Sequence, residues 1–92
     1  MPAALQDVAL IVDSTMSAQS VESALREGAG ELLESITCFD RYDKIGDGKI
    51  SLAFTLTFRA PNRTLTGEEV SSMREAATAM AFAKCGAVVR TA

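Results

Sequence analysis

An unbroken alternation of apolar and small or polar residues from Ile50 to Arg59 constrains the fold of this chain more than any other feature. The first set is Ile50, Leu52, Phe54, Leu56 and Phe58, and the second is Ser51, Ala53, Thr55, Thr57 and Arg59. A period of two puts successive side chains on opposite faces of a β-strand. The segment is therefore predicted to be a strand with one buried face and one open face.

Before this strand, the pattern predicts another strand followed by a helix. Residues 8–13 alternate in the same way and predict a strand with one wholly apolar face. Ser17 is a good helix N-cap, and Met16 and Val21 have the spacing of a hydrophobic staple around it. The glycines of residues 28–30 are expected to end this helix.

The other segments predict two more strands and a second helix. In residues 31–42, apolar side chains stand at both odd-numbered and even-numbered positions. We interpret this segment as a strand with a bulge, followed by a turn over 43–48. Thr66 and Glu69 have the spacing of a capping box. The helix that they begin is expected to end near Cys85, with a short last strand over 87–91.

The order strand, helix, strand, strand, helix, strand favours an α+β, ferredoxin-like sandwich: a four-stranded antiparallel sheet with both helices on one face. No linker interrupts residues 1–92, so we expect a single domain. The other face of the sheet would then be open. Its expected side chains come from the first and third strands: Asp7, Ala9, Ile11, Ser51, Ala53, Thr55 and Thr57.

Composition argues against most enzyme classes. The chain has no histidine, and Cys38 and Cys85 are 47 positions apart, so zinc fingers and His-based catalysis are excluded. Residues 43–54 imitate a calcium loop but have Phe54 where the closing carboxylate belongs. An acylphosphatase-like hydrolase would need an arginine after the first strand, and residues 13–16 supply none. We predict no catalytic residue, no metal site and no cofactor in this domain.

The charge distribution bears on the partners. The net charge is −3, made up of −6 in residues 1–40 and +3 in residues 41–92, and taken whole it argues against binding nucleic acid by bulk electrostatics. No DNA partner is expected. The basic residues could form a stripe of Lys44, Lys49, Arg59, Arg63 and Arg90, although in a small domain such an asymmetry is more often chance. No apolar run is long enough for a membrane span and no signal peptide is evident. We expect a cytoplasmic chain with reduced thiols.

One aromatic residue stands out as a candidate for contact with RNA. Asp40 and Tyr42 are two apart and hence on one face of a strand, where Tyr42 can stack on a base and Asp40 can accept hydrogen bonds from a base edge. The alternative is an edge-strand tyrosine that is half packed. A general RNA-recognition motif is not expected, because it places aromatic residues on the open faces of the first and third strands.

Several short motifs run along the whole chain. They are Phe39-Asp40-x-Tyr42, Gly48-Lys49-x-Ser51-Leu52-Ala53, Phe58-Arg59, Arg63-Thr64-Leu65-Thr66-x-Glu68-Glu69-Val70 and Gly86-Ala87-x-x-Arg90, with Pro2, Asp7 and Ala9. Together they resemble one family, the ferredoxin-fold anticodon-binding domain at the C-terminus of the bacterial phenylalanyl-tRNA synthetase β subunit. The chain departs from the family at Gln6, where an arginine is usual, and at Met1, where an aromatic residue is usual.

The resemblance implies a module that binds the anticodon region of phenylalanine tRNA and has no active site of its own. It places the first anticodon base near Asp40 and Tyr42, with Ala9 and Ser51 close by; Lys49 and Arg63 are expected to contact the RNA backbone. It further implies an α subunit and the remainder of a β subunit in a heterotetramer, with ATP and magnesium used only in the parent enzyme, of which this chain is expected to be a fragment. The alternative is an interaction or regulatory module that binds a protein or a small effector through the open sheet.

Overall fold

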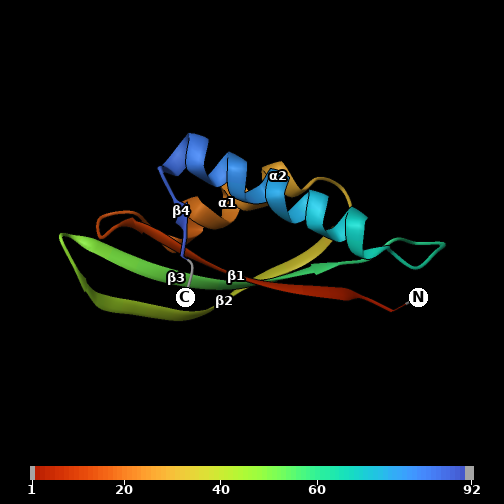
Figure 1. Cartoon of the computed structure of the whole chain (residues 1–92), viewed down its shortest axis with the longest axis horizontal. Coiled ribbons are helices and arrows are strands. Elements are labelled where there is room, and N and C mark those ends of the chain that lie inside the picture. Colours follow the sequence, from red (N-terminus) through yellow and green to blue (C-terminus); the bar gives the residue numbers. More distant parts are fainter. Residues whose placement is uncertain (1, 91–92) are drawn as a thin grey trace.

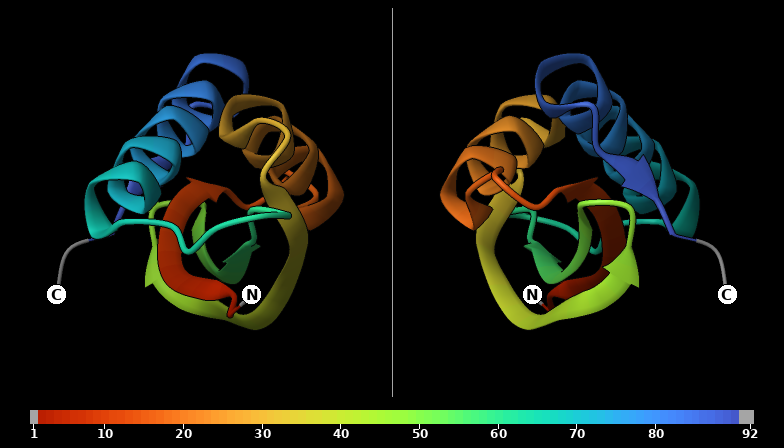
Figure 2. Two further views of the ribbon diagram at one scale, coloured as in Figure 1. Left: turned by 90° about the vertical axis from the view of Figure 1, so that its right-hand side faces the viewer. Right: turned by 90° about the vertical axis from the view of Figure 1, so that its left-hand side faces the viewer.

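The computed structural model describes residues 2–90, which form six elements in the predicted order. These are β1 (Ala4–Asp13), α1 (Ala18–Ala29), β2 (Leu33–Gly46), β3 (Lys49–Phe58), α2 (Gly67–Cys85) and β4 (Val88–Val89). The strands form one antiparallel sheet in the order β2-β3-β1-β4. Both helices lie on the same face of this sheet, and the other face is left open (Figure 1, Figure 2). The ferredoxin-like sandwich is confirmed.

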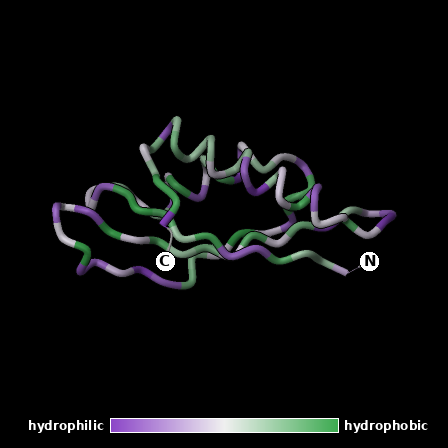
Figure 3. The backbone as a smooth tube through the Cα atoms, viewed as in Figure 1, coloured by the Kyte–Doolittle hydropathy of each residue, from purple (hydrophilic) through white to green (hydrophobic). Residues whose placement is uncertain are grey.

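The core lies between the sheet and the two helices. β1 pairs with β3 over its full length, from Ala4 opposite Phe58 to Asp13 opposite Lys49, so the apolar faces of both strands point the same way. All the predicted core residues of these strands are buried: Val8, Leu10, Val12, Ile50, Leu52, Phe54, Leu56 and Phe58. Hydrophilic segments lie in the turns at the two ends of the long axis, and others lie along β2 and on the helices (Figure 3).

The helix ends follow the sequence signals. The Ser17 hydroxyl oxygen accepts a hydrogen bond from the Ser20 backbone N–H at 3.1 Å. Thr66 and Glu69 form the complete capping box, in which each side chain accepts a hydrogen bond from the other residue's backbone N–H, both at 3.1 Å. Gly86 ends α2 in the left-handed conformation at φ 66°, which glycine adopts without steric cost.

The helices pack closely at one glycine. A Cβ atom built on Gly28 of α1 would lie 2.5 Å from the carbonyl oxygen of Ala76 and 2.7 Å from the Cβ of Met80, both in α2. Only a residue without a side chain fits at this crossing. Neither described helix is long and apolar enough to cross a membrane.

Three strands differ in extent from the predictions. β1 begins at Ala4 because its first residues also pair with β3. β2 continues to Gly46, so the turn is only Asp47 and Gly48; both have positive φ, at 56° and 69°, as the tightest hairpin turns require. β4 has two residues, although the Arg90 backbone N–H still donates to the Ala9 carbonyl at 2.8 Å. The last residue predicted for this strand, at position 91, lies outside the described residues.

Candidate nucleic-acid interface

A bulge in β2 decides which side chains reach the open face. Cys38 pairs with Phe54 of β3, but the next paired residue, Asp40, lies opposite Ala53, so Phe39 has no partner across the ladder. Because of the extra residue, even-numbered side chains of β2, which point to the core face before the bulge, point to the open face after it. Cys38 therefore shares the core face with Phe54, whereas Asp40 shares the open face with Ala53. The predicted bulge is confirmed.

Two neighbouring rows of side chains result, each running across several strands. The aspartate row consists of Asp40, Ala53 and Ala9, and the tyrosine row consists of Tyr42, Ser51, Ile11 and Val88. Directly opposite residues of antiparallel strands lie on the same face, and residues two apart on one strand are neighbours on that face. The structure thus brings Ala9, Asp40, Tyr42 and Ser51, four of the six residues predicted for the site, onto one part of the sheet.

Asp40 is exposed and already partly oriented. Its Oδ1 accepts a hydrogen bond from the backbone N–H of Arg41 at 2.9 Å, and no donor within residues 2–90 contacts its Oδ2. A carboxylate in this state is a ready acceptor for two adjacent N–H groups at the edge of a base. The other two residues of the aspartate row are alanines, whose small side chains leave the surface beside Asp40 flat.

Tyr42 contacts a basic residue that the sequence analysis did not place in the site. Its side chain is exposed, and the guanidinium carbon of Arg90 lies 5.5 Å from the centroid of its ring. This distance is within the range of a cation–π interaction. The closing Gly86-Ala87-x-x-Arg90 motif contains the residue, but the motif does not show that its side chain reaches Tyr42, which lies on the opposite edge strand.

Ser51 departs from the expectation that it would be exposed. It is on the open face by its register, yet only 4% of its surface is accessible. The reason is that both of its neighbours in the tyrosine row, Tyr42 and Ile11, have larger side chains than serine. Ser51 is therefore the floor of this part of the face and not a projecting contact.

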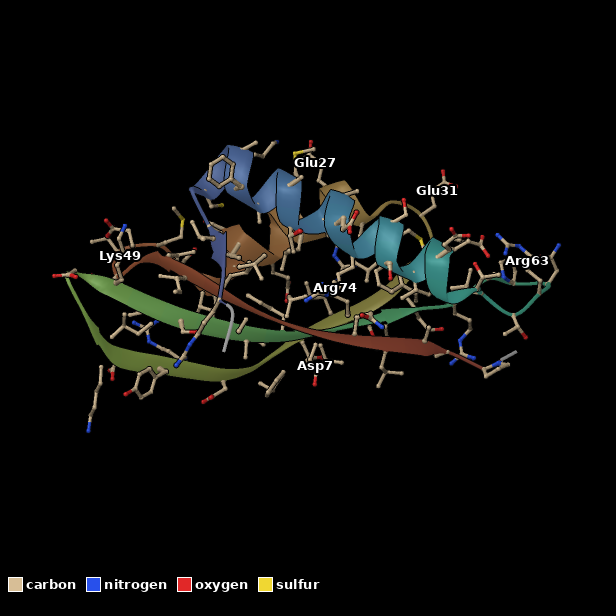
Figure 4. All side chains as sticks on the ribbon, in the orientation of Figure 1. Asp7, Glu27, Glu31, Lys49, Arg63 and Arg74 are labelled. Atoms are coloured by element: carbon tan, nitrogen blue, oxygen red, sulfur yellow. The ribbon has the colours of Figure 1, made fainter. Side chains whose placement is uncertain are left out.

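The structure does not bring Lys49 and Arg63 together. They lie at opposite ends of the long axis of the molecule, which measures 45 Å (Figure 4). Lys49 is exposed beside the hairpin turn, opposite Asp13. The pKa of the Asp13 carboxyl is lowered by hydrogen bonds from the Thr15 backbone and hydroxyl and, to a smaller extent, by the charge of Lys49.

Arg63 belongs to the start of α2. Its Nη1 and Nη2 atoms each lie 2.6 Å from a carboxylate oxygen of Glu69, the residue that closes the capping box. The hydrogen bond and the charge of Glu69 raise the pKa of Arg63, and the reciprocal interaction lowers the pKa of Glu69 to about 2. Another basic residue, Arg59, forms an ion pair with Glu34 at 2.7 Å.

The two thiols are half-buried and free. Cys38 donates to the carbonyl of Asp40 at 3.6 Å, and Cys85 donates to that of Ser20 at 3.7 Å. Among the described residues, no group of three or more Cys, Asp and Glu side chains is placed to hold a metal ion. The side chains that the structure does bring together are suited to hydrogen bonding and stacking.

The fold and the open face define a ferredoxin-like α+β domain with an exposed aromatic and acidic surface. A family model described as the ferredoxin-fold anticodon binding domain matches residues 1–90. The chain belongs to this family.

The curated relatives are much longer proteins of one kind. The chain is 58% identical over 91 residues to the phenylalanine–tRNA ligase beta subunit of Corynebacterium jeikeium, and 58% identical over 92 residues to that of Streptomyces avermitilis. It is 55% identical over 91 residues to that of Thermobifida fusca. Each alignment covers 97–98% of this chain but only 11% of the relative. The resemblance stated from the sequence motifs is confirmed.

Proposed function

We propose that the open face of the sheet binds the anticodon loop of phenylalanine tRNA. The observation that carries this proposal is the bulge at Phe39, which places Asp40 and Tyr42 side by side on the open face. Tyr42 stacks on the first anticodon base, and Asp40 accepts hydrogen bonds from the edge of that base. Arg90 holds the ring of Tyr42 and adds a positive charge close to the RNA backbone.

The other predicted site residues have smaller parts in this proposal. Ala9 forms the floor beside the base, where its small side chain allows a flat ring to approach the sheet. Ser51 lies beneath the tyrosine row and supports the ring of Tyr42 from the sheet side. Lys49, at the hairpin turn, contacts a phosphate. Arg63 is also proposed to contact the RNA backbone, through the face of its guanidinium that Glu69 does not occupy.

The domain serves a larger enzyme in this proposal. It forms part of a phenylalanine–tRNA ligase β subunit, which assembles with an α subunit into a heterotetramer and works in the cytoplasm. ATP and magnesium act elsewhere in that enzyme during aminoacylation, so this domain supplies recognition of the tRNA and no chemistry. A net charge of −3 is compatible with such a role, because reading one base needs few phosphate contacts.

The test is an amide chemical-shift titration of the isotope-labelled chain with a phenylalanine-tRNA anticodon stem-loop at low salt. Shifts are expected at Ala9, Asp40, Tyr42 and Ser51. A stem-loop with a different first anticodon base is the control, and its shifts at these positions should be weaker. Absence of shifts at millimolar RNA would contradict the proposal and favour the alternative, an interaction module for a protein or a small effector.

A further inference from the structure

A second pair of an apolar side chain and a carboxylate lies on the open face. Leu5 and Asp7 are two residues apart on β1 and share a face, as Tyr42 and Asp40 do on β2. Leu5 is 62% exposed, and Asp7 is also exposed. Asp7 lies on the side of the sheet away from the helices (Figure 4).

The two carboxylates are oriented in the same way. Oδ1 of Asp7 accepts a hydrogen bond from the Thr55 hydroxyl at 2.8 Å, as Oδ1 of Asp40 accepts one from the Arg41 backbone. In the described part of the chain, no donor contacts the Oδ2 atom of either side chain. Each aspartate thus keeps one acceptor free while the other holds the side chain in place, which lowers the entropic cost of binding a donor.

A flat path connects the two pairs. Asp7 lies opposite Thr55, which lies opposite Thr37, and this row is next to the aspartate row of Asp40, Ala53 and Ala9. The two aspartates are therefore two strands and one row apart, with about 12 Å between their backbones from the usual spacings of a sheet. Between them, on β3, lie Thr55 and Ala53, whose side chains are small, so an RNA strand can pass from one aspartate to the other.

We propose that Leu5 and Asp7 form a second nucleotide site, which holds a nucleotide close in sequence to the one at Asp40 and Tyr42. This inference rests on the proposed function. The face of the base packs on Leu5, in the way that apolar side chains contact unstacked bases. An exocyclic amino group of the base donates to Oδ2 of Asp7. The site therefore prefers a base with an amino group to uracil, which has none.

The test compares Asp7→Asn with Glu31→Gln in equilibrium binding of the anticodon stem-loop to the whole chain. Both substitutions remove one negative charge, which by itself favours binding of a polyanion. Glu31 is exposed and lies on the helix side of the molecule, far from Asp7 (Figure 4). Asp7→Asn is expected to weaken binding about tenfold, the loss of a hydrogen bond to a charged acceptor. Glu31→Gln should leave binding unchanged or slightly tighter.

A second measurement identifies the nucleotide. Each loop nucleotide is replaced in turn by uracil or, where uracil is present, by an abasic residue. At one position other than the first anticodon base, the replacement should weaken binding of the stem-loop to the unaltered chain. The same replacement should not further weaken its binding to the Asp7→Asn variant. Binding by Asp7→Asn equal to that of Glu31→Gln would overturn the second site and leave the proposed function intact.

Two other results would also overturn it. The first is weaker binding by Asp7→Asn together with an equal further loss for every nucleotide replacement, which would indicate a disturbed sheet. The amide spectrum of Asp7→Asn checks the sheet, since the amide oxygen of asparagine can still accept the hydrogen bond from Thr55. Failure of the unaltered chain to bind the stem-loop would overturn the proposed function and, with it, the second site.

Discussion

The Arg90 guanidinium lies 5.5 Å from the centre of the Tyr42 ring, although the two residues are 48 positions apart in the chain and come from opposite edges of the sheet. The backbone of Arg90 is fixed by its hydrogen bond to the Ala9 carbonyl. The last described residue of the chain thus supports the aromatic ring that we propose for base stacking.

Tyr42→Ala is expected to weaken binding of the anticodon stem-loop by about 1–3 kcal/mol, the usual range for one base stacked on an aromatic side chain. Tyr42 is 44% exposed, so its truncation should leave the fold intact. Fluorescence anisotropy measures the binding and a thermal melt measures the stability. Tyr42→Phe is the matched control, since it keeps the ring. Unchanged binding by Tyr42→Ala would remove this residue from the site.

Arg90 and Tyr42 should be energetically coupled in RNA binding. An exposed cation–π interaction contributes about 0.5–1 kcal/mol. A double-mutant cycle with Arg90→Ala and Tyr42→Ala is therefore expected to show a coupling energy of that size. Strict additivity would show that Arg90 does not act through the ring of Tyr42.

The capping box of α2 should make the stability of the domain depend on pH. Contacts from Arg63 and Thr66 lower the pKa of Glu69 from its ordinary 4.5 to about 2. A carboxyl with a lower pKa in the folded state stabilises the fold fully above pH 4.5, and this contribution is lost as the pH falls towards 2. Urea unfolding between pH 2 and 6 measures the effect.

In that experiment, the free energy of unfolding of Glu69→Gln should change less with pH between pH 2 and 4.5 than that of the unaltered chain. Glu68→Gln gives the same change of charge in the same helical turn, and its pH dependence should resemble that of the unaltered chain. Equal slopes for Glu69→Gln and the unaltered chain would show that Glu69 is not responsible.

Gly28→Ala should destabilise the fold although alanine is the better helix former. Overpacking costs about 1–3 kcal/mol, and the gain in helix propensity offsets up to about 1 kcal/mol of this. Gly67→Ala is the control, because no atom lies within 4 Å of the Cβ it would add. If a urea melt shows both variants to be equally stable, the helices can separate at Gly28 without penalty.

Leu56→Ala should lower the free energy of unfolding by about 2–5 kcal/mol, because the side chain is fully buried between the sheet and the helices. The thermal midpoint is the measurement. A midpoint that barely moves would mean that this side chain is not part of the core.

Most of the fold was predictable because its signals are local. The alternation around Phe54 and the capping box at Thr66 each lie within ten residues and determine which face is buried and where a helix begins. The extension of β2 to Gly46 was not predicted from the sequence. Its last residues lie beyond the helices (Figure 1) and show no alternation of buried and exposed side chains. The fold class, by contrast, followed from the order of the elements alone.

The candidate site was predictable only in part. The spacing of Asp40 and Tyr42 placed them on one face, but which face depends on a bulge whose effect the local pattern does not show. The burial of Ser51 and the position of Arg90 depend on pairings between distant strands. Nothing in the sequence shows that Arg63 forms an ion pair with Glu69.

The bulge at Phe39 also separates two kinds of mutational sensitivity within one strand. Before the bulge, the even-numbered residue Ile36 faces the core, so substitutions there change how much folded protein is present. After the bulge, the even-numbered residue Tyr42 faces outwards, so substitutions there change what the folded protein binds. Loss of the extra residue at the bulge would turn Tyr42 towards the core face and remove it from the binding surface.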